Sequence, residues 1–161
     1  MPDRLMVIVS LGGFALQRHL RAGAVRCRPA IVTLDGPPQV TLDPYPGRQG
    51  RGIVADGWAR LVDGDGAEVA ARRLTDAGPA ALRWDDLDVL SYTAATVWTW
   101  LALPLALDRP ELTVVARDGG ALEVQVPDGW PGAGRHLLHI DGDGRVFRHE
   151  EGHVVHHLSG H

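Results

Sequence analysis

The sequence contains no lysine and no asparagine, so all sixteen of its basic residues are arginine. A Schiff base forms on a lysine amine, and the phosphate loop of Walker-type nucleotide-binding proteins also requires a lysine. Pyridoxal-phosphate enzymes, lysine aldolases and Walker-type nucleotide-binding proteins are therefore excluded.

Cysteine and serine are nearly absent as well. Cys27 is the single cysteine, so the chain forms no internal disulfide and no cysteine-rich zinc site. Serine occurs only at Ser10, Ser91 and Ser159, none of which lies in the G-x-S-x-G motif of the α/β-hydrolases. Low cysteine content suits a reducing compartment, and we expect a cytoplasmic protein.

Long apolar runs and clusters of charge are also missing. The apolar stretch over residues 5–16 is too short to cross a bilayer, and no signal-peptidase site follows it. The net charge is −4 and the basic residues are scattered, so neither a membrane span nor a nucleic-acid partner is expected. A chain of 161 residues that is 45% hydrophobic is expected to fold as a single domain over residues 1–161.

Short apolar segments separated by Asp-Gly turns predict an antiparallel sheet. Such segments fill residues 30–73 and return over residues 112–158, and the turns between them are typical of hairpins. The DGDG turns at 63–66 and 141–144 are predicted to be hairpin turns rather than calcium loops, because neither has a glutamate at the twelfth position. A short helix is expected over residues 14–23.

The segment 84–107 is the one long helix that the sequence predicts. Asp85 or Asp86 is suited to cap its start, and Pro104 is expected to kink or end it. The apolar residues of one helical face recur at spacings of three and four: Leu87, Leu90, Ala94, Val97, Leu101 and Leu105. The predicted fold class is α+β, with a curved antiparallel sheet of about seven to nine strands (a half-barrel or open barrel) covered by this apolar helix.

The tail "HEEGHVVHH" (149–157) contains the spacing His-Glu-x-x-His of zinc proteases. That motif requires a helix, whereas Gly152 and the β-branched valines that follow favour two strands joined by a turn at Glu151-Gly152. We therefore predict no metal ion and no other cofactor. The residues that a hairpin would bring nearest to one ion are His149, His153 and His156, with His139 as a further candidate.

Several motifs together resemble a family of uncharacterised bacterial proteins from GC-rich genomes. The resemblance covers about residues 35–161, and its motifs are "DPYPGRQG" (43–50), "RWDDLD" (83–88), "VWTWLALPL" (97–105), "DGDGRVFRHE" (141–150) and "HHLSGH" (156–161). It implies a helix opened by Trp-Asp-x-Leu and followed by a β-meander, and it implies no activity. The order of elements also resembles, more weakly, the half-barrel of bacterial lipoprotein carriers, which implies an apolar cavity beneath a curved sheet.

The first functional hypothesis is the binding of an apolar small molecule or acyl chain in a cavity between sheet and helix. The aromatic residues that would line or close such a cavity are Trp58, Tyr92, Trp98 and Trp100. The alternative interpretation is that these rings fill an ordinary core, which aromatic side chains dominate in most proteins.

The second hypothesis is a cofactor-independent cyclase or isomerase acting on a secondary-metabolite intermediate. The acid–base candidates for this chemistry are Asp85, Asp86, His136, His139, Arg148 and His156, and the alternative for each is surface charge or helix capping. A third hypothesis is a structural or interaction protein, which an exposed apolar sheet edge or helix face at an oligomer interface would support; a homo-oligomer is one such assembly. The sequence does not decide whether the protein is an enzyme.

Overall fold

The computed structural model divides the chain into two compact units. The N-terminal unit comprises Met1–Leu103 and Gly129–Gly132, and the C-terminal unit comprises Pro104–Asp128 and Ala133–His161. The residues that the structure describes are 5–7, 18–20, 24–27, 30–33, 36–45, 49–74, 85–144, 146–151 and 154–157.

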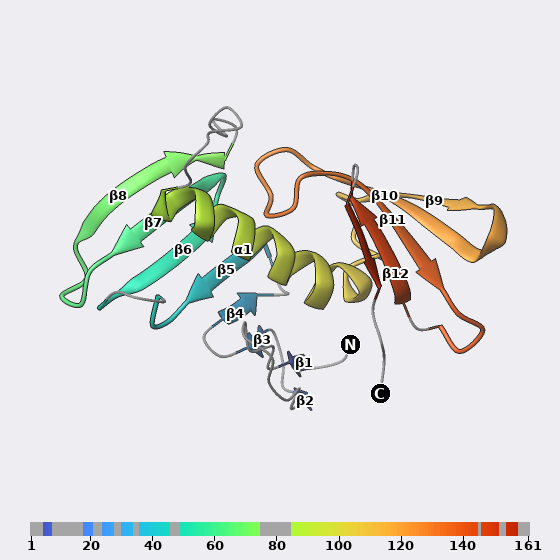
Figure 1. Ribbon diagram of the computed structural model, residues 1–161, viewed down its shortest axis with the longest axis horizontal. Helices are drawn as coiled ribbons and strands as arrows, with labels where there is room; N and C mark the ends of the chain where they lie inside the picture. Colours follow the sequence, from blue (N-terminus) through green and yellow to red (C-terminus); the bar gives the residue numbers. More distant parts are fainter. Residues whose placement is uncertain are drawn as a thin grey trace. The chain divides into compact units, whose positions relative to one another are not determined.

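A six-stranded antiparallel sheet forms the larger part of the N-terminal unit (Figure 1). Its strands are paired in sequence order: β3 (Ala24–Cys27), β4 (Ala30–Thr33), β5 (Gln39–Leu42), β6 (Arg51–Ala55), β7 (Trp58–Val62) and β8 (Glu68–Arg73). Asp56 and Gly57 join β6 to β7, and both have positive φ, as the tightest hairpin turns require. A separate pair consists of β1 (Leu5–Val7) and β2 (Arg18–Leu20). The helix expected over residues 14–23 is therefore wrong for Arg18–Leu20, the part of that segment that the structure describes.

Helix α1 (Asp86–Leu101) lies across one face of this sheet (Figure 1). The predicted stripe is confirmed for its first five residues, because Leu87, Leu90, Ala94, Val97 and Leu101 are all buried. It is wrong for Leu105, which is 42% exposed and lies beyond the end of α1. Gly52 in β6 allows the close approach, since a Cβ there would lie 2.6 Å from a methyl group of Leu90. The buried side chains that the sheet contributes include Val32, Val40, Leu42, Val54 and Leu61.

The helix is shorter than the predicted segment 84–107. It ends at Leu101, and a 3₁₀ helix follows over Leu103–Leu105. The reason is Pro104, which has no N–H to continue the helical hydrogen bonds and whose ring clashes with the preceding turn.

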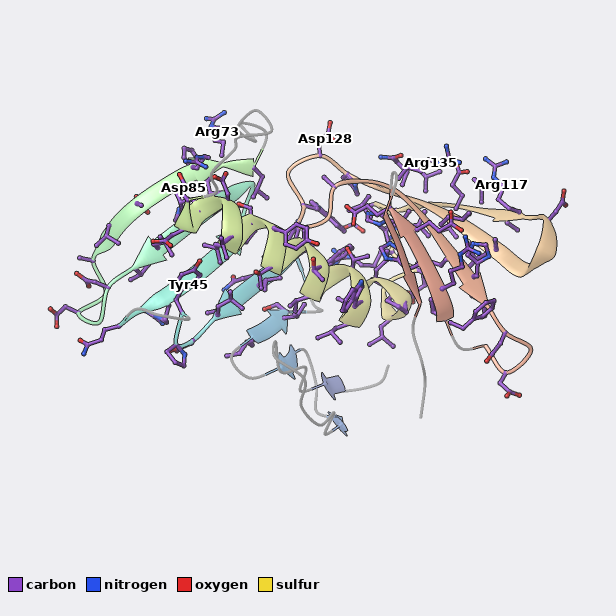
Figure 2. All side chains as sticks on the ribbon, in the orientation of Figure 1. Tyr45, Arg73, Asp85, Arg117, Asp128 and Arg135 are labelled. Atoms are coloured by element: carbon purple, nitrogen blue, oxygen red, sulfur yellow. The ribbon has the colours of Figure 1, made fainter. Side chains whose placement is uncertain are left out.

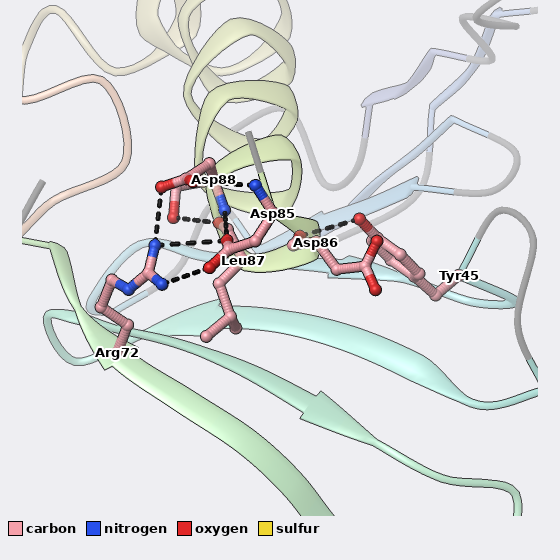
Figure 3. Close-up of polar contacts among 7 residues, drawn as sticks. Tyr45, Arg72, Asp85, Asp86, Leu87 and Asp88 are labelled. Atoms are coloured by element: carbon pink, nitrogen blue, oxygen red, sulfur yellow. Dashed lines mark hydrogen bonds and ion pairs between the residues drawn. The ribbon is translucent and has the colours of Figure 1, made fainter. Parts of the chain in front are cut away.

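A capping box fixes the start of α1 (Figure 3). The Asp85 carboxylate accepts a hydrogen bond from the Asp88 N–H at 2.9 Å, and the Asp88 carboxylate accepts one from the Asp85 N–H at 3.0 Å. Arg72 of β8 donates to both carboxylates, and its hydrogen bond to Asp85 lowers the pKa of that carboxyl. The Tyr45 hydroxyl donates to the Asp86 carbonyl at 2.9 Å, so the sheet and a neighbouring loop hold the first turn from two sides.

The C-terminal unit is an antiparallel meander, as the sequence predicted. Its five strands are β9 (Thr113–Arg117), β10 (Ala121–Val126), β11 (Gly134–Ile140), β12 (Val146–Glu151) and β13 (Val154–His157), paired in sequence order. Val124, Val126 and Leu138 are buried. Because they alternate with more exposed neighbours, one face of this sheet forms the core of the unit.

The α+β class is confirmed, but the single curved sheet of about seven to nine strands is not. In the part of the chain that the structure describes, the two meanders form separate sheets, of six and five strands. None of the helices within this part is both long enough and apolar enough to cross a membrane.

Asp85→Ala is expected to lower the free energy of unfolding by roughly 1 kcal/mol, because the cap on the Asp88 N–H is lost. Asp85→Asn is expected to lose less, since asparagine also caps well and an exposed ion pair with Arg72 contributes little. Urea unfolding of the three proteins measures the difference, and equal losses for the alanine and asparagine variants would contradict this assignment.

The stability difference between wild type and Asp85→Ala should also depend on pH. The pKa of Asp85 is lowered in the folded protein, so its contribution is fully present above the ordinary value of 3.8. The contribution disappears as the pH falls through the lowered folded pKa. Urea unfolding at a series of pH values should therefore show a constant difference near neutrality and a shrinking one below pH 3.8.

Candidate functional site

The aromatic residues of α1 lie in different surroundings. Trp98 is buried at 1% exposure and meets the Trp130 ring edge-on, with the ring centroids 5.9 Å apart. Trp100 is half-buried and Tyr92 is 53% exposed. Trp98 thus has the environment of a core residue, whereas Tyr92 is largely open to solvent.

Trp58 lies on β7, and two arginines flank its ring. The guanidinium carbons of Arg60 and Arg73 lie 5.7 and 5.2 Å from the ring centroid, within the range of cation–π contacts. The ring of Trp58 is therefore in contact with side chains of its own sheet.

A shallow recess of about 270 Å³ opens in the N-terminal unit at one end of β6 and β7. Its wall includes the buried Leu61 and the exposed Val69, and Arg51 adds a guanidinium. None of the four predicted aromatic residues lines it. The full set of lining residues is Tyr45, Gln49, Gly50, Arg51, Leu61, Val62, Asp63 and Val69.

The predicted acid–base residues fall into separate groups. Asp85 and Asp86 begin α1 in the N-terminal unit, where the Asp85 carboxylate serves as the helix cap. His136, His139 and Arg148 lie on β11 and β12 of the C-terminal unit. Asp85 and Asp86 therefore belong to one unit, and His136, His139 and Arg148 belong to the other.

The C-terminal unit contains a pair of buried histidines on neighbouring strands. His136 of β11 and His149 of β12 are 0% and 1% exposed. The His136 Nδ1 and the His149 Nε2 are 2.9 Å apart, and the two ring planes are inclined to each other by 22°. At this distance one nitrogen donates a proton and the other accepts it through its lone pair. The two rings are therefore hydrogen-bonded to each other in a position screened from water.

Glu151 completes a group of three possible metal ligands. One ligand atom from each of His136, His149 and Glu151 can be chosen so that all three lie within 4.8 Å of one another. Glu151 is only half-buried, so its carboxylate lies closer to solvent than the rings do. Two nitrogens and one carboxylate oxygen form a common donor set for zinc and related ions.

The register of β11 against β12 brings these three residues together. His136 is directly opposite Glu151, and Leu138 is directly opposite His149. Directly opposed residues share a face, and so do residues two apart on one strand. All three possible ligands therefore lie on the face that also carries the buried Leu138.

A register shift between His139 and Ile140 decides which carboxylate joins the histidines. Arg148 pairs with His139 and Val146 pairs with Ile140, so Phe147 is an extra residue on β12. If the pairing of Ile140 with Val146 continued along the two strands without the shift, His136 would lie opposite Glu150. The two histidines would then lie on opposite faces of the sheet.

The other face of the sheet is charged and more exposed. The Glu150 carboxylate contacts the His139 Nε2 at 2.8 Å and an Arg148 nitrogen at 3.0 Å. Arg117 and Arg135 extend from this face and both pair with Glu123 (Figure 2). His139 and Glu150 therefore belong to a surface ion-pair network, separate from His149 and Glu151.

The prediction that the His-Glu-x-x-His spacing is not helical is confirmed, because β12 and β13 are strands. The predicted turn at Glu151-Gly152 is wrong for Glu151, which is the last residue of β12. His156 is the register partner of His149 on β13, and His153 lies outside the described residues.

Glu151 is the site residue that the sequence reasoning missed. Its signal was the His-x-Glu spacing at 149 and 151, which puts both side chains on one face of a strand. The predicted turn hid this signal.

Comparisons with models of known protein families, with curated proteins and with solved structures find no match for this chain. The family resemblance inferred from the motifs therefore stays a prediction, and so does the role assigned to each candidate residue.

The buried histidine pair leads to a prediction about stability. His136→Leu and His149→Leu are each expected to lower the free energy of unfolding by about 1–3 kcal/mol, because each removes the hydrogen-bond partner of a buried ring nitrogen. The double variant is expected to cost less than the sum of the two, since neighbours that share an interaction are not additive. Urea unfolding in the presence of a metal chelator measures this coupling, and strictly additive losses would show that the pair is not an energetic unit.

Proposed function

We propose that the C-terminal unit binds one divalent transition-metal ion through His136, His149 and Glu151. The observation that carries this proposal is the pair of buried histidine rings at 2.9 Å with a carboxylate beside them. It replaces the expectation that the chain binds no metal.

The donor set favours the later first-row metals. Imidazole nitrogen suits Zn²⁺, Cu²⁺, Ni²⁺ and Fe²⁺, whereas Ca²⁺ and Mg²⁺ prefer sites made of oxygen alone. Within the group only Glu151 supplies oxygen. Zn²⁺ is therefore the appropriate first probe.

The distance between the rings fits this assignment. Zn–N bonds of about 2.0–2.1 Å in a tetrahedral site place two ligand nitrogens about 3.3 Å apart. The observed separation of 2.9 Å therefore has to open by about 0.4 Å for an ion to lie between the two nitrogens. Small rotations of two side chains on adjacent strands can supply this change. The ring that now donates the hydrogen bond would then carry its proton on its other nitrogen and bind the ion as a neutral imidazole.

The test is zinc binding by the full chain after treatment with a chelator. We expect one Zn²⁺ per chain by elemental analysis after dialysis. We expect His149→Ala and Glu151→Gln to weaken binding at least about tenfold, because each removes a direct ligand. Addition of Zn²⁺ should also raise the melting temperature, because an ion that binds the folded chain stabilises it by mass action.

Matched controls come from the opposite face of the same two strands. His139→Ala and Glu150→Gln change the same residue types in the surface network, so they should leave zinc binding unchanged. The proposal would be contradicted by two results together. Zinc binding would persist in His149→Ala, and it would disappear in a variant that replaces the tail histidines His153, His156, His157 and His161.

A second candidate function is the binding of an apolar small molecule or acyl chain in the N-terminal unit. The supporting observation is the recess of about 270 Å³, whose lining combines the apolar residues Leu61 and Val69 with the charged residues Arg51 and Asp63. Its volume is just below that of typical ligand sites, which favours a small molecule over a long chain. Arg51 in its lining could pair with an acidic group of such a molecule. The cyclase or isomerase alternative stays a prediction.

Anilinonaphthalene sulfonate, which has an apolar ring system and one anionic group, tests the recess. Its fluorescence should rise on binding, and Arg51→Gln should weaken the affinity about two- to fivefold, because an exposed charge pair contributes little. Val69→Asp should weaken it further, and its cost to folding is small because Val69 is 54% exposed. Arg60→Gln, outside the recess, is the control, and equal effects of Arg51→Gln and Arg60→Gln would rule out binding there.

A further inference from the structure

We propose that the metal site of the C-terminal unit keeps one exchangeable coordination position and takes a small anionic ligand there. This inference rests on the metal-binding function proposed above. Such a site differs from a structural metal site, in which protein ligands fill every coordination position.

The composition of the chain is the first argument. Structural zinc sites are closed by four protein ligands, and their usual sets all contain cysteine. These sets contain at least two cysteines, whereas the sequence has one, Cys27. Two histidines and a glutamate, with water in the fourth position, are instead the ligands of catalytic zinc sites.

The burial of the three ligands is the second argument. His136 and His149 are 0% and 1% exposed, so protein atoms cover the nitrogen side of the site. Glu151, the last residue of its strand, is only half-buried, so it is the one ligand of the three that has part of its surface in contact with solvent. An exchangeable ligand therefore enters beside Glu151.

Charge decides which ligand is preferred. Two neutral imidazoles and one carboxylate leave a net charge of +1 on a divalent ion. In a site largely shielded from water this charge attracts an anion more strongly than it attracts a neutral molecule. The ligand class is accordingly a small anion with an oxygen or nitrogen donor, such as hydroxide, azide or a carboxylate.

His156 is the residue that could close the position instead. Its backbone on β13 lies opposite His149 in the register. A fourth protein ligand from this strand would turn the site into a closed one, so the experiment must separate the two arrangements.

The experiment uses the full chain loaded with Co²⁺, whose visible absorption spectrum depends on the number and kind of its ligands. Azide is the probe. We expect a saturable shift of the cobalt spectrum on addition of azide in the wild type, and the same shift in the controls His139→Ala and Glu150→Gln. Neither control removes a proposed ligand.

Two other outcomes are distinguishable. If the chain binds no stoichiometric Co²⁺ or Zn²⁺, the proposed metal function fails and the exchangeable position fails with it. If Co²⁺ binds but azide leaves the spectrum unchanged, metal binding stands and the exchangeable position is overturned. A response to azide that appears only in His156→Ala would also overturn it, and would identify His156 as the fourth ligand.

Discussion

The register shift between β11 and β12 is the constraint on which the candidate site depends. One extra residue, Phe147, moves the pairing by a single position, and a one-residue slip turns every side chain of a strand to the other face. With the shift, His136, His149 and Glu151 share the inner face, and Glu150 joins the charged outer face. Adjacent glutamates thereby acquire different chemistry although their intrinsic properties are identical.

The N-terminal unit depends on a different constraint, the close packing of α1 on its sheet. Gly52 leaves room for Leu90, and Arg72 together with Tyr45 holds the first turn of the helix. These contacts show that Asp85 acts as a helix cap and that much of the apolar surface of α1 belongs to the core of the unit. The candidate metal site lies in the smaller unit, where two buried histidines are hydrogen-bonded to each other beside a carboxylate.

Local patterns in the sequence predicted local structure well. Alternating apolar residues and Asp-Gly turns located the hairpins, because strand pairing across a short turn is settled by neighbouring residues. The stripe from Leu87 to Leu101 located the buried face of α1, and Asp85 was among the residues expected to cap it. The helix was predicted to be too long because apolar residues continue past Pro104. The predicted tail turn included Glu151, which is the last residue of β12, because a glycine at 152 indicates a turn without fixing where it starts.

The sequence alone determined the α+β class, the exclusion of lysine- and cysteine-dependent chemistry, and the strand character of the histidine tail, since each follows from composition or short-range periodicity. The division of the strands between two sheets was decided only by the tertiary structure, because each meander satisfies its own turns and hydrogen bonds whether or not it joins the other. The convergence of His136 with His149 and Glu151 was likewise decided there. It arises from the register between two strands, and a single residue at Phe147, rather than any motif, sets that register.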